Sequence, residues 1–186
     1  PAIYVRTAIG EEGTSTGQTI TLAGATAFEL LDIPLLLDSL DQPGFPVAMT
    51  GYLSGWPGGE LLKSDDSGQT WDDLQGFLSP GATIGTASNV IGATVTAMID
   101  KSSVLTVSLI GGELSSVTEL AMLNGANYFA YGINGRWEII AAQNCTLQGD
   151  GSYILTDLLR GQQGTEWACG LHAVGDKVIA LDSSLA

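Results

Sequence analysis

Hydrophobic and polar residues alternate in short runs along most of the chain. The clearest run is residues 103–110, SVLTVSLI, in which Leu105, Val107 and Leu109 share one face and hydroxyl residues lie between them. A period of two is typical of a half-buried strand. Residues 45–53, FPVAMTGYL, predict another strand, which ends at a loop rich in Gly and Pro. The pattern predicts an all-β fold.

Turn signals between these runs predict antiparallel hairpins. The dipeptide Asn134-Gly135 is the clearest of them, because both residues tolerate the positive φ of a two-residue hairpin turn. The other predicted hairpins span residues 59–74 with a tip at 65–68, surround residues 149–151, and surround residues 175–176.

Helical signals are scarce. Ser116 precedes Glu119 at the spacing of a capping box, and the Asn-Gly pair at 124–125 would end a short helix. Residues 26–43 imitate a helix start. Pro34 would break such a helix, however, so we expect an extended segment there.

We expect a single β-rich domain over residues 1–186, a β-sandwich-like arrangement of antiparallel hairpins with at most one or two short helices. Small residues dominate 79–101, where we expect a loop followed by a strand. An internal boundary, if the chain has one, falls near residues 79–100. No repeat of propeller-blade length is visible, which argues against a propeller.

Composition restricts the partners of the chain. It carries 20 acidic residues against six Lys and Arg, a formal net charge of −14. Nucleic-acid binding requires a basic surface that displaces counterions from phosphates, so we expect no nucleic-acid partner. Apolar runs such as IPLLL at 33–37 are too short to span a bilayer, so we expect no membrane insertion.

Metal and cofactor chemistry finds little support in the sequence. His172 is the only histidine, no nucleotide-binding or nucleophile motif occurs, and we expect His172 to be structural. Cys145 and Cys169 are too few for a disulfide framework, so we expect free thiols, with pairing as the alternative. We expect no metal and no cofactor. The chain begins at Pro1 without a signal-peptide pattern, so we expect a piece of a longer or processed polypeptide.

A distinct motif lies at the tip of the hairpin predicted for residues 59–74. Ser64, Asp66, Gly68 and Trp71 fit the pattern S-x-D-x-G-x-x-W, which resembles the Asp box of sialidases and other glycan-active β-propellers. Short polar side chains can bond backbone amides in a tight turn, and glycine adopts conformations closed to other residues. We expect Trp71 to pack back across the hairpin as an apolar plug. The motif then stabilises a turn and places no reactive group.

Glycoside hydrolysis is one alternative that this motif raises. It requires two carboxyl groups facing across the scissile bond, and a sialidase also needs arginines that clamp the substrate carboxylate. The chain has one box and three arginines, Arg6, Arg136 and Arg160. We expect no catalytic residue and no enzymatic activity. The candidate carboxylates are Asp65, Asp66, Asp72, Asp73, Glu113, Glu138 and Glu166.

A carbohydrate-binding β module is the other alternative. Aromatic rings in loops would provide the platform on which a sugar stacks. The rings that would form this platform are Tyr52, Trp56, Trp71 and Trp167.

The C-terminal third carries several motifs in a fixed order. They are Trp137-Glu138, a Tyr-x-Leu strand at 153–155, LLRGQQGTE at 158–166, and a Gly-acidic turn that leads into residues 176–182. This order resembles the C-terminal region of large phage tail-tip and baseplate hub proteins, the gene-transfer-agent and siphophage proteins that contain a TIM-barrel-like domain. Matches at 30–36, 55–68 and 123–127 extend the resemblance from about Leu30 onward.

The resemblance implies a virion structural protein of the tail tip, assembled in the bacterial cytoplasm, with no known activity in this region. Its partners would be other tail and baseplate proteins. Distal domains of such proteins often face the host, so the resemblance also implies contact with a bacterial surface receptor or glycan. The candidate ligand contacts are Tyr52, Trp56 and Trp167.

Residues 158–168, LLRGQQGTEWA, predict an ordered loop. Two leucines should anchor it in the core, and an arginine set directly after them is expected to be buried. Its five donors suit backbone carbonyls or a carboxylate. We expect Arg160 to organise this loop with Glu166 as its acidic partner, and a solvated surface arginine is the alternative. The residues of this structural loop are Arg160, Gly161, Gly164, Thr165 and Glu166.

Overall fold

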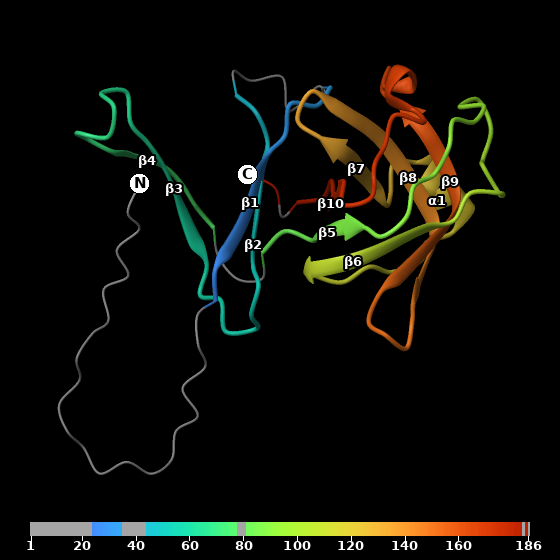
Figure 1. The fold of residues 1–186 in the computed structure, drawn as a ribbon, viewed down its shortest axis with the longest axis horizontal. Helices are drawn as coiled ribbons and strands as arrows, with labels where there is room; N and C mark the ends of the chain where they lie inside the picture. The colour runs from blue at the N-terminus through green and yellow to red at the C-terminus, as the bar shows by residue number, and fades with distance from the viewer. Residues whose placement is uncertain (1–23, 35–43, 78–80, 184, 186) are drawn as a thin grey trace, which may run out of the picture.

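The regular secondary structure of the described residues is almost entirely antiparallel β-strand (Figure 1). The computed structural model describes residues 24–34, 44–77, 81–183 and 185. Within these residues the strands and helices are β1 (Thr26–Leu30), β2 (Val47–Gly51), β3 (Gly59–Lys63), β4 (Asp72–Phe77), β5 (Ile84–Ala87), β6 (Leu105–Gly111), α1 (Glu119–Leu123), β7 (Tyr128–Ile133), β8 (Arg136–Leu147), β9 (Tyr153–Gln162), the 3-10 helix η2 (Glu166–Ala168) and β10 (Lys177–Ala180).

Six of these strands form a closed antiparallel barrel in the order β10-β5-β6-β9-β8-β7. The four-residue strand β10 closes it, because β10 pairs with β5 on one side and with β7 on the other. The prediction of an all-β fold with at most one or two short helices is confirmed. The sandwich-like arrangement is replaced by a barrel, and closure removes the free edges that two facing sheets would keep.

Three of the four predicted hairpins are confirmed. Strands β7 and β8 flank Asn134-Gly135, β8 and β9 flank residues 149–151, and β3 and β4 flank the Asp box. The hairpin predicted around residues 175–176 is wrong. Its turn bonds to the end of β5 instead, through Gly175 N–H to the Ala87 carbonyl, and β10 pairs with strands distant in sequence.

Residues 79–101 also depart from prediction. The strand, β5, comes first, and the loop after it runs to a single bridge between Asp100 and Leu158. The order is reversed because IGTA at 84–87 pairs with both β6 and β10 and is mostly buried. The alternating Thr and Val residues further along have no such neighbouring strands among the described residues, so they remain in the loop.

Helix α1 forms where the sequence predicts a short helix and ends at Asn124 as expected. Its N-cap, however, is Thr118, whose hydroxyl accepts a hydrogen bond from Ala121 N–H. Ser116 instead accepts from the Cys145 backbone N–H at 3.0 Å, which ties the approach to α1 onto β8. No helix in the described residues is long and apolar enough to cross a membrane.

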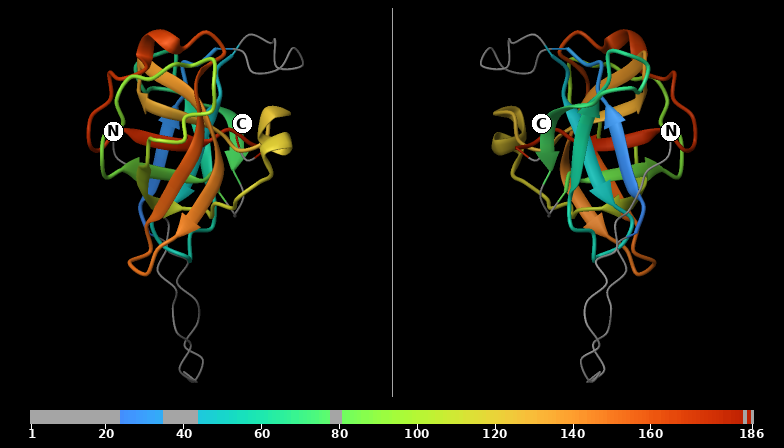
Figure 2. Two further views of the ribbon diagram at one scale, coloured as in Figure 1. Left: turned by 90° about the vertical axis from the view of Figure 1, so that its right-hand side faces the viewer. Right: turned by 90° about the vertical axis from the view of Figure 1, so that its left-hand side faces the viewer.

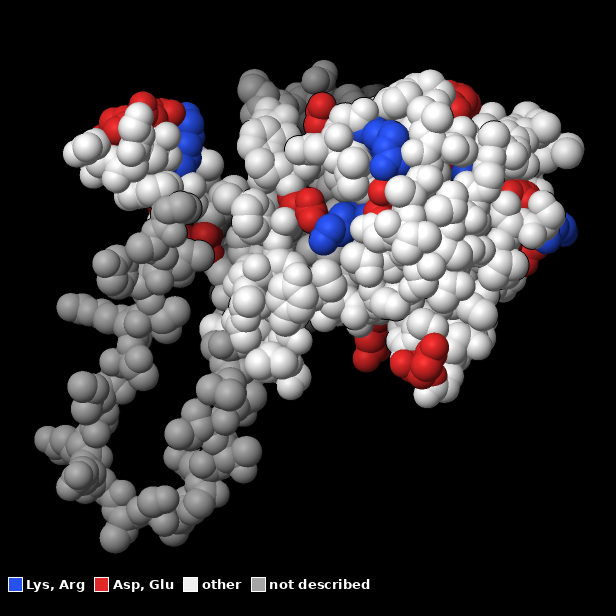
Figure 3. Space-filling model, viewed as in Figure 1, with Lys and Arg blue, Asp and Glu red and all other residues white. Residues whose placement is uncertain are grey.

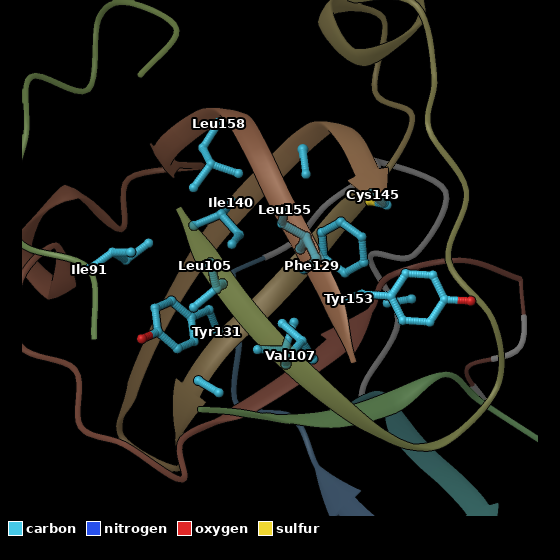
Figure 4. Close-up of a cluster of buried hydrophobic side chains, with 14 residues drawn as sticks. Ile91, Leu105, Val107, Phe129, Tyr131, Ile140, Cys145, Tyr153, Leu155 and Leu158 are labelled. Carbon is cyan, nitrogen blue, oxygen red and sulfur yellow. The ribbon is translucent and has the colours of Figure 1, made fainter. Parts of the chain in front are cut away.

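The interior of the barrel is an apolar core. Side chains from β6, β7, β8 and β9 point toward one another within it, among them Leu105, Phe129, Ile140 and Leu155 (Figure 4). Each is 2% exposed or less, so each contributes about 1.5–3 kcal/mol from burial. Alternation along the strands separates this core from a second one outside the barrel wall.

The second core joins the barrel to the pair formed by β1 and β2. Trp137 and Ile139 of β8 face outward and pack with Leu31 and Ala48. The β1–β2 pair therefore lies between the barrel and the β3–β4 hairpin (Figure 1), and Figure 2 views this stack from either end. On the face of the pair away from the barrel, Trp56 covers a smaller cluster with Val47, Met49 and Leu61.

A glycine in β7 gives a test of the barrel's geometry. Gly132 has φ +138°, and a Cβ there would lie 2.1 Å from the Arg136 carbonyl oxygen. Gly132→Ala should therefore lower the free energy of unfolding by more than about 1 kcal/mol. Gly149→Ala, at an open position, is the matched control and should change stability little. Urea denaturation measures both, and equal stabilities would contradict the barrel's pairing at Gly132.

Candidate functional site

A buried ion pair lies at one end of the barrel. Glu138 is two residues before Ile140 on β8, so its side chain points to the barrel interior. Arg160 donates to it twice, from Nε to Oε1 at 2.7 Å and from Nη2 to Oε2 at 2.9 Å. Both side chains are fully buried. This bidentate geometry matches the planar guanidinium to the carboxylate and fixes the orientation of both groups.

Arg160 points inward by alternation from Leu158 of the barrel core, and a β-bulge lies beside it. In the pairing of β8 with β9, Ile139 faces Gln162 while Ala141 faces Leu159, so β9 carries one extra residue. Gly161 takes φ +57° within this bulge, and its N–H donates to Glu138 Oε1 at 2.9 Å. A side chain there would meet the Glu166 backbone at 2.8 Å. The glycine is required because the bulge needs both a left-handed conformation and a close approach.

His172 links this pair to a second ion pair. Its Nε2 lies 2.6 Å from Glu138 Oε2, and its Nδ1 lies 3.3 Å from Asp176 Oδ2. A carboxylate only accepts hydrogen bonds, so the shorter contact puts a proton on Nε2. The imidazole also stacks on Tyr131 of the barrel core, with ring centroids 3.8 Å apart. Asp176 in turn accepts two bonds from Arg136, each of 2.9 Å.

The other side of Arg160 contacts the loop that follows β5. Its Nη1 donates to the Gly92 carbonyl at 3.2 Å and lies 3.8 Å from Asp100 Oδ2. Its Nη2 also donates to the Cys169 sulfur at 3.4 Å. Guanidinium and carboxylates therefore hold segments far apart in sequence at one end of the barrel. We call the following six residues the charge cluster: Asp100, Arg136, Glu138, Arg160, His172 and Asp176.

The carboxylates of Glu138 and Asp176 are held ionised. Burial alone would raise the pKa of Glu138, but hydrogen bonds from His172 and Arg160 and the charge of Arg160 outweigh it, so this pKa lies below its ordinary value of 4.5. Asp176 shows the same balance. Burial would raise its pKa, but the bonds from Arg136 and the Ala173 N–H outweigh burial and hold this pKa below its ordinary value of 3.8.

The predicted structural loop is ordered, with one different partner. Arg160 is buried as predicted, which excludes the solvated alternative. Thr165, 1% exposed, accepts from Ile139 N–H at 2.8 Å, and Gly164 takes φ +80° in the turn before it. The prediction of Glu166 as the partner of Arg160 is wrong. Glu166 is exposed at the start of η2, and the acidic partner of Arg160 is Glu138.

The Asp box forms the turn that its spacing predicts. Asp66 Oδ1 accepts from the N–H groups of Gln69 and Thr70 at 2.9 and 2.8 Å, and Ser64 Oγ accepts from Gly68 N–H at 2.7 Å. Hydrogen bonds from the Thr70 N–H and hydroxyl are the main reasons that the pKa of Asp66 falls to about 2. Both Asp66 oxygens are engaged inside the turn, so this carboxylate serves the hairpin.

The aromatic candidates are distributed differently from prediction. Trp71 is 56% exposed, so it is no plug, although its ring lies beside Gly68. Trp56 is 6% exposed and donates from Nε1 to Thr26 Oγ1, so it cannot serve as a ligand platform. Tyr52 and Trp167 are exposed, but they belong to a loop after β2 and to η2. The four-ring platform therefore does not exist.

The chemistry of the charge cluster follows from its burial. Glu138 and Arg160 expose none of their side-chain surface, so this ion pair orders chain segments and presents no reactive group to solvent. The two cysteines are free as predicted, and burial raises the pKa of Cys145 to about 12. Within the described part of the chain, no three His, Cys, Asp or Glu side chains are placed to hold a metal ion.

The roles of Glu138, Asp100 and Asp176 were not predicted from the sequence. One signal for Glu138 was present, because it is the single charge between Trp137 and a run of isoleucines and alanines. A charge inside such a strand needs a partner, and the chain holds only three arginines. His172 was expected to be structural, and the structure gives it contacts with Glu138 and Asp176.

The barrel residues match a known protein family. Residues 82–179, just over half of the 186 residues, match the family model described as Rcc01698-like, C-terminal. Rcc01698 is a gene-transfer-agent protein. No curated protein matches the chain. The match begins at residue 82, not near Leu30, and it covers the barrel strands β5 to β10 as far as Ile179.

The charge cluster predicts acid sensitivity. Because the folded-state pKa of Glu138 lies below 4.5, its ion pair stabilises the fold above that pH, and the stabilisation is lost as pH falls through the folded-state pKa. Glu138→Gln leaves Arg160 buried without its bidentate counterion and should cost about 3–5 kcal/mol at neutral pH. The deficit should shrink as the pH falls through the folded-state pKa, because the wild-type carboxyl becomes protonated.

The matched control for this variant is Glu166→Gln, the same change at an exposed position of the same structural loop. It should change the free energy of unfolding by less than about 0.5 kcal/mol. Urea denaturation across the pH range measures the wild type and both variants. Equal stability of all three at neutral pH would contradict the role given to Glu138.

Proposed function

Because the chain belongs to the Rcc01698-like, C-terminal family, which is associated with gene transfer agents, we propose that it is a structural component of the tail tip or baseplate of a phage-like particle. The observation that carries this proposal is the family match, which covers all but the last residue of the barrel strands. The motif LLRGQQGTE, which carries the resemblance to tail hub proteins, lies within the matched residues.

The physical character of the barrel supports a structural role. Its sheet is closed, and the charge cluster holds one end of it in a single arrangement. A unit of this kind keeps its shape when neighbouring proteins pack against it. Its partners on this proposal are other tail and baseplate proteins, and its location is the virion, after assembly in the bacterial cytoplasm.

We propose further that the chain is not an enzyme. The carboxylates of Glu138 and Asp176 both contact His172, and both residues are almost completely buried. Asp66, the acid of the Asp box, is bonded within its own turn. These carboxylates serve the fold, which leaves the hypothesis of an Asp-box hydrolase without support from them.

Contact with the host surface is a second candidate role. Trp167 favours this role, because its side chain is 59% exposed and lies on the short helix η2, directly after the turn at Gly164. An exposed indole on an ordered segment can stack against a sugar or another ring at low entropic cost. The ligand class would be a bacterial surface glycan or receptor.

Labelling of purified particles tests the structural proposal. An antibody against the barrel should label one end of the tail in electron micrographs, and mass spectrometry should detect the chain in the same particles. A capsid-directed antibody is the control for intact particles. Absence of the chain from purified particles, or label confined to the capsid, would overturn the proposal.

A further inference from the structure

Strand β1 carries an exposed apolar face. Its side chains alternate, so Phe28 and Leu30 lie on one side while Glu29 lies on the other, where it pairs with Lys177 of β10 at 3.2 Å. Phe28 is 57% exposed and Leu30 is 38% exposed. Phe45, two residues before β2 and 56% exposed, continues this side of the pair. We call Phe28, Leu30 and Phe45 the β1 face.

Within the described residues, the backbone of β1 is also unpaired along one edge. Its pairing with β2 includes bonds from Leu31 N–H to the Pro46 carbonyl and from Tyr52 N–H to the Ala25 carbonyl. Odd-numbered residues of β1 therefore bond to β2, because hydrogen-bonded and non-bonded pairs alternate in an antiparallel ladder. The N–H and C=O groups of Phe28 and Leu30 point to the opposite edge, with which no described strand pairs.

The β1 face adjoins an apolar cluster that is already formed. Met49 pairs with Phe28 and Val47 pairs with Leu30, and both partners are buried under Trp56. A strand added beside β1 would extend this cluster by one row. Strand addition to an open edge supplies main-chain hydrogen bonds, and alternate side chains supply specificity.

The hairpin on the same side of the β1–β2 pair is acidic. The β3–β4 hairpin packs on the same side of the β1–β2 pair through Leu61. Its tip, with acidic atoms in red beside basic atoms in blue, stands apart from the rest of the molecule in Figure 3. The exposed charges on this hairpin are Glu60, Lys63, Asp65, Asp66, Asp72 and Asp73. A strand added to β1 would therefore lie on the same side of the pair as a hairpin of net negative charge.

We propose that β1 receives a strand of another protein of the particle, with apolar side chains at alternate positions and Lys or Arg between them. This inference rests on the proposed function, because it takes the partner from the same assembly. The apolar side chains would lie on the β1 face, and the basic ones would complement the net negative charge of the chain and of its hairpin. The net charge of −14 opposes a second copy of this chain as the occupant.

A synthetic strand tests the proposal on the full chain. The probe is a capped peptide of about nine residues that alternates Val and Lys, and the control peptide has Glu in place of Lys. Fluorescence anisotropy should show the Lys peptide binding about tenfold more tightly or better. Hydrogen exchange should show that it protects the Phe28 and Leu30 amides by about tenfold or more.

Two variants locate the binding. Phe28→Thr and Leu30→Thr should each weaken the Lys peptide about tenfold, since threonine keeps β-propensity but removes apolar contact. Val95→Thr, at a 64% exposed site in the loop after β5, is the matched control and should leave binding unchanged.

Three results would overturn the proposal. The two peptides could bind equally, the Phe28 and Leu30 amides could already be protected without peptide, or sedimentation could reveal a dimer that Phe28→Thr dissolves. The last two would identify this chain or a second copy as the occupant. Particle labelling stays independent of these outcomes, so failure here and failure of the proposed function are distinguishable.

Discussion

The ion pair between Glu138 and Arg160 is the contact on which the closed end of the barrel depends. A buried carboxylate is costly unless charge and hydrogen bonds compensate it, and here a bidentate arginine, a backbone N–H and an imidazole do so. Meeting those requirements fixes the bulge at Gly161 and the position of His172. The segment between β9 and β10 therefore has one arrangement, although its only regular element is the short helix η2.

The chain combines a barrel with an added part of different physical character. The barrel coincides closely with the residues matched to the Rcc01698-like family, and its strands close on themselves. The β1–β2 pair and the β3–β4 hairpin precede it and carry exposed apolar and acidic side chains. Strand β1 keeps an edge with which no described strand pairs. Rigidity belongs to the first part, and the proposed assembly contact belongs to the second.

Local signals predicted local structure well. The alternation of apolar and polar residues predicted β6, and Asn134-Gly135 predicted the turn between β7 and β8. The spacing of the Asp box predicted the hydrogen bonds from backbone amides to Asp66. The failures concern distant partners. Glu166 is near Arg160 in sequence, but Glu138, 22 residues away, is the partner, because β8 pairs with β9 and both side chains point into the barrel. Closure by β10 likewise depends on pairing with β5, which no local pattern encodes.

A double-mutant cycle tests the central claim most directly. Glu138→Leu and Arg160→Met each leave one buried charge without its partner, whereas the double variant removes both charges of the pair. The loss of stability in the double variant should therefore be smaller than the sum of the single losses by about 2–3 kcal/mol. Losses that add to within about 0.5 kcal/mol would show that the two side chains do not depend on each other, and would contradict the account.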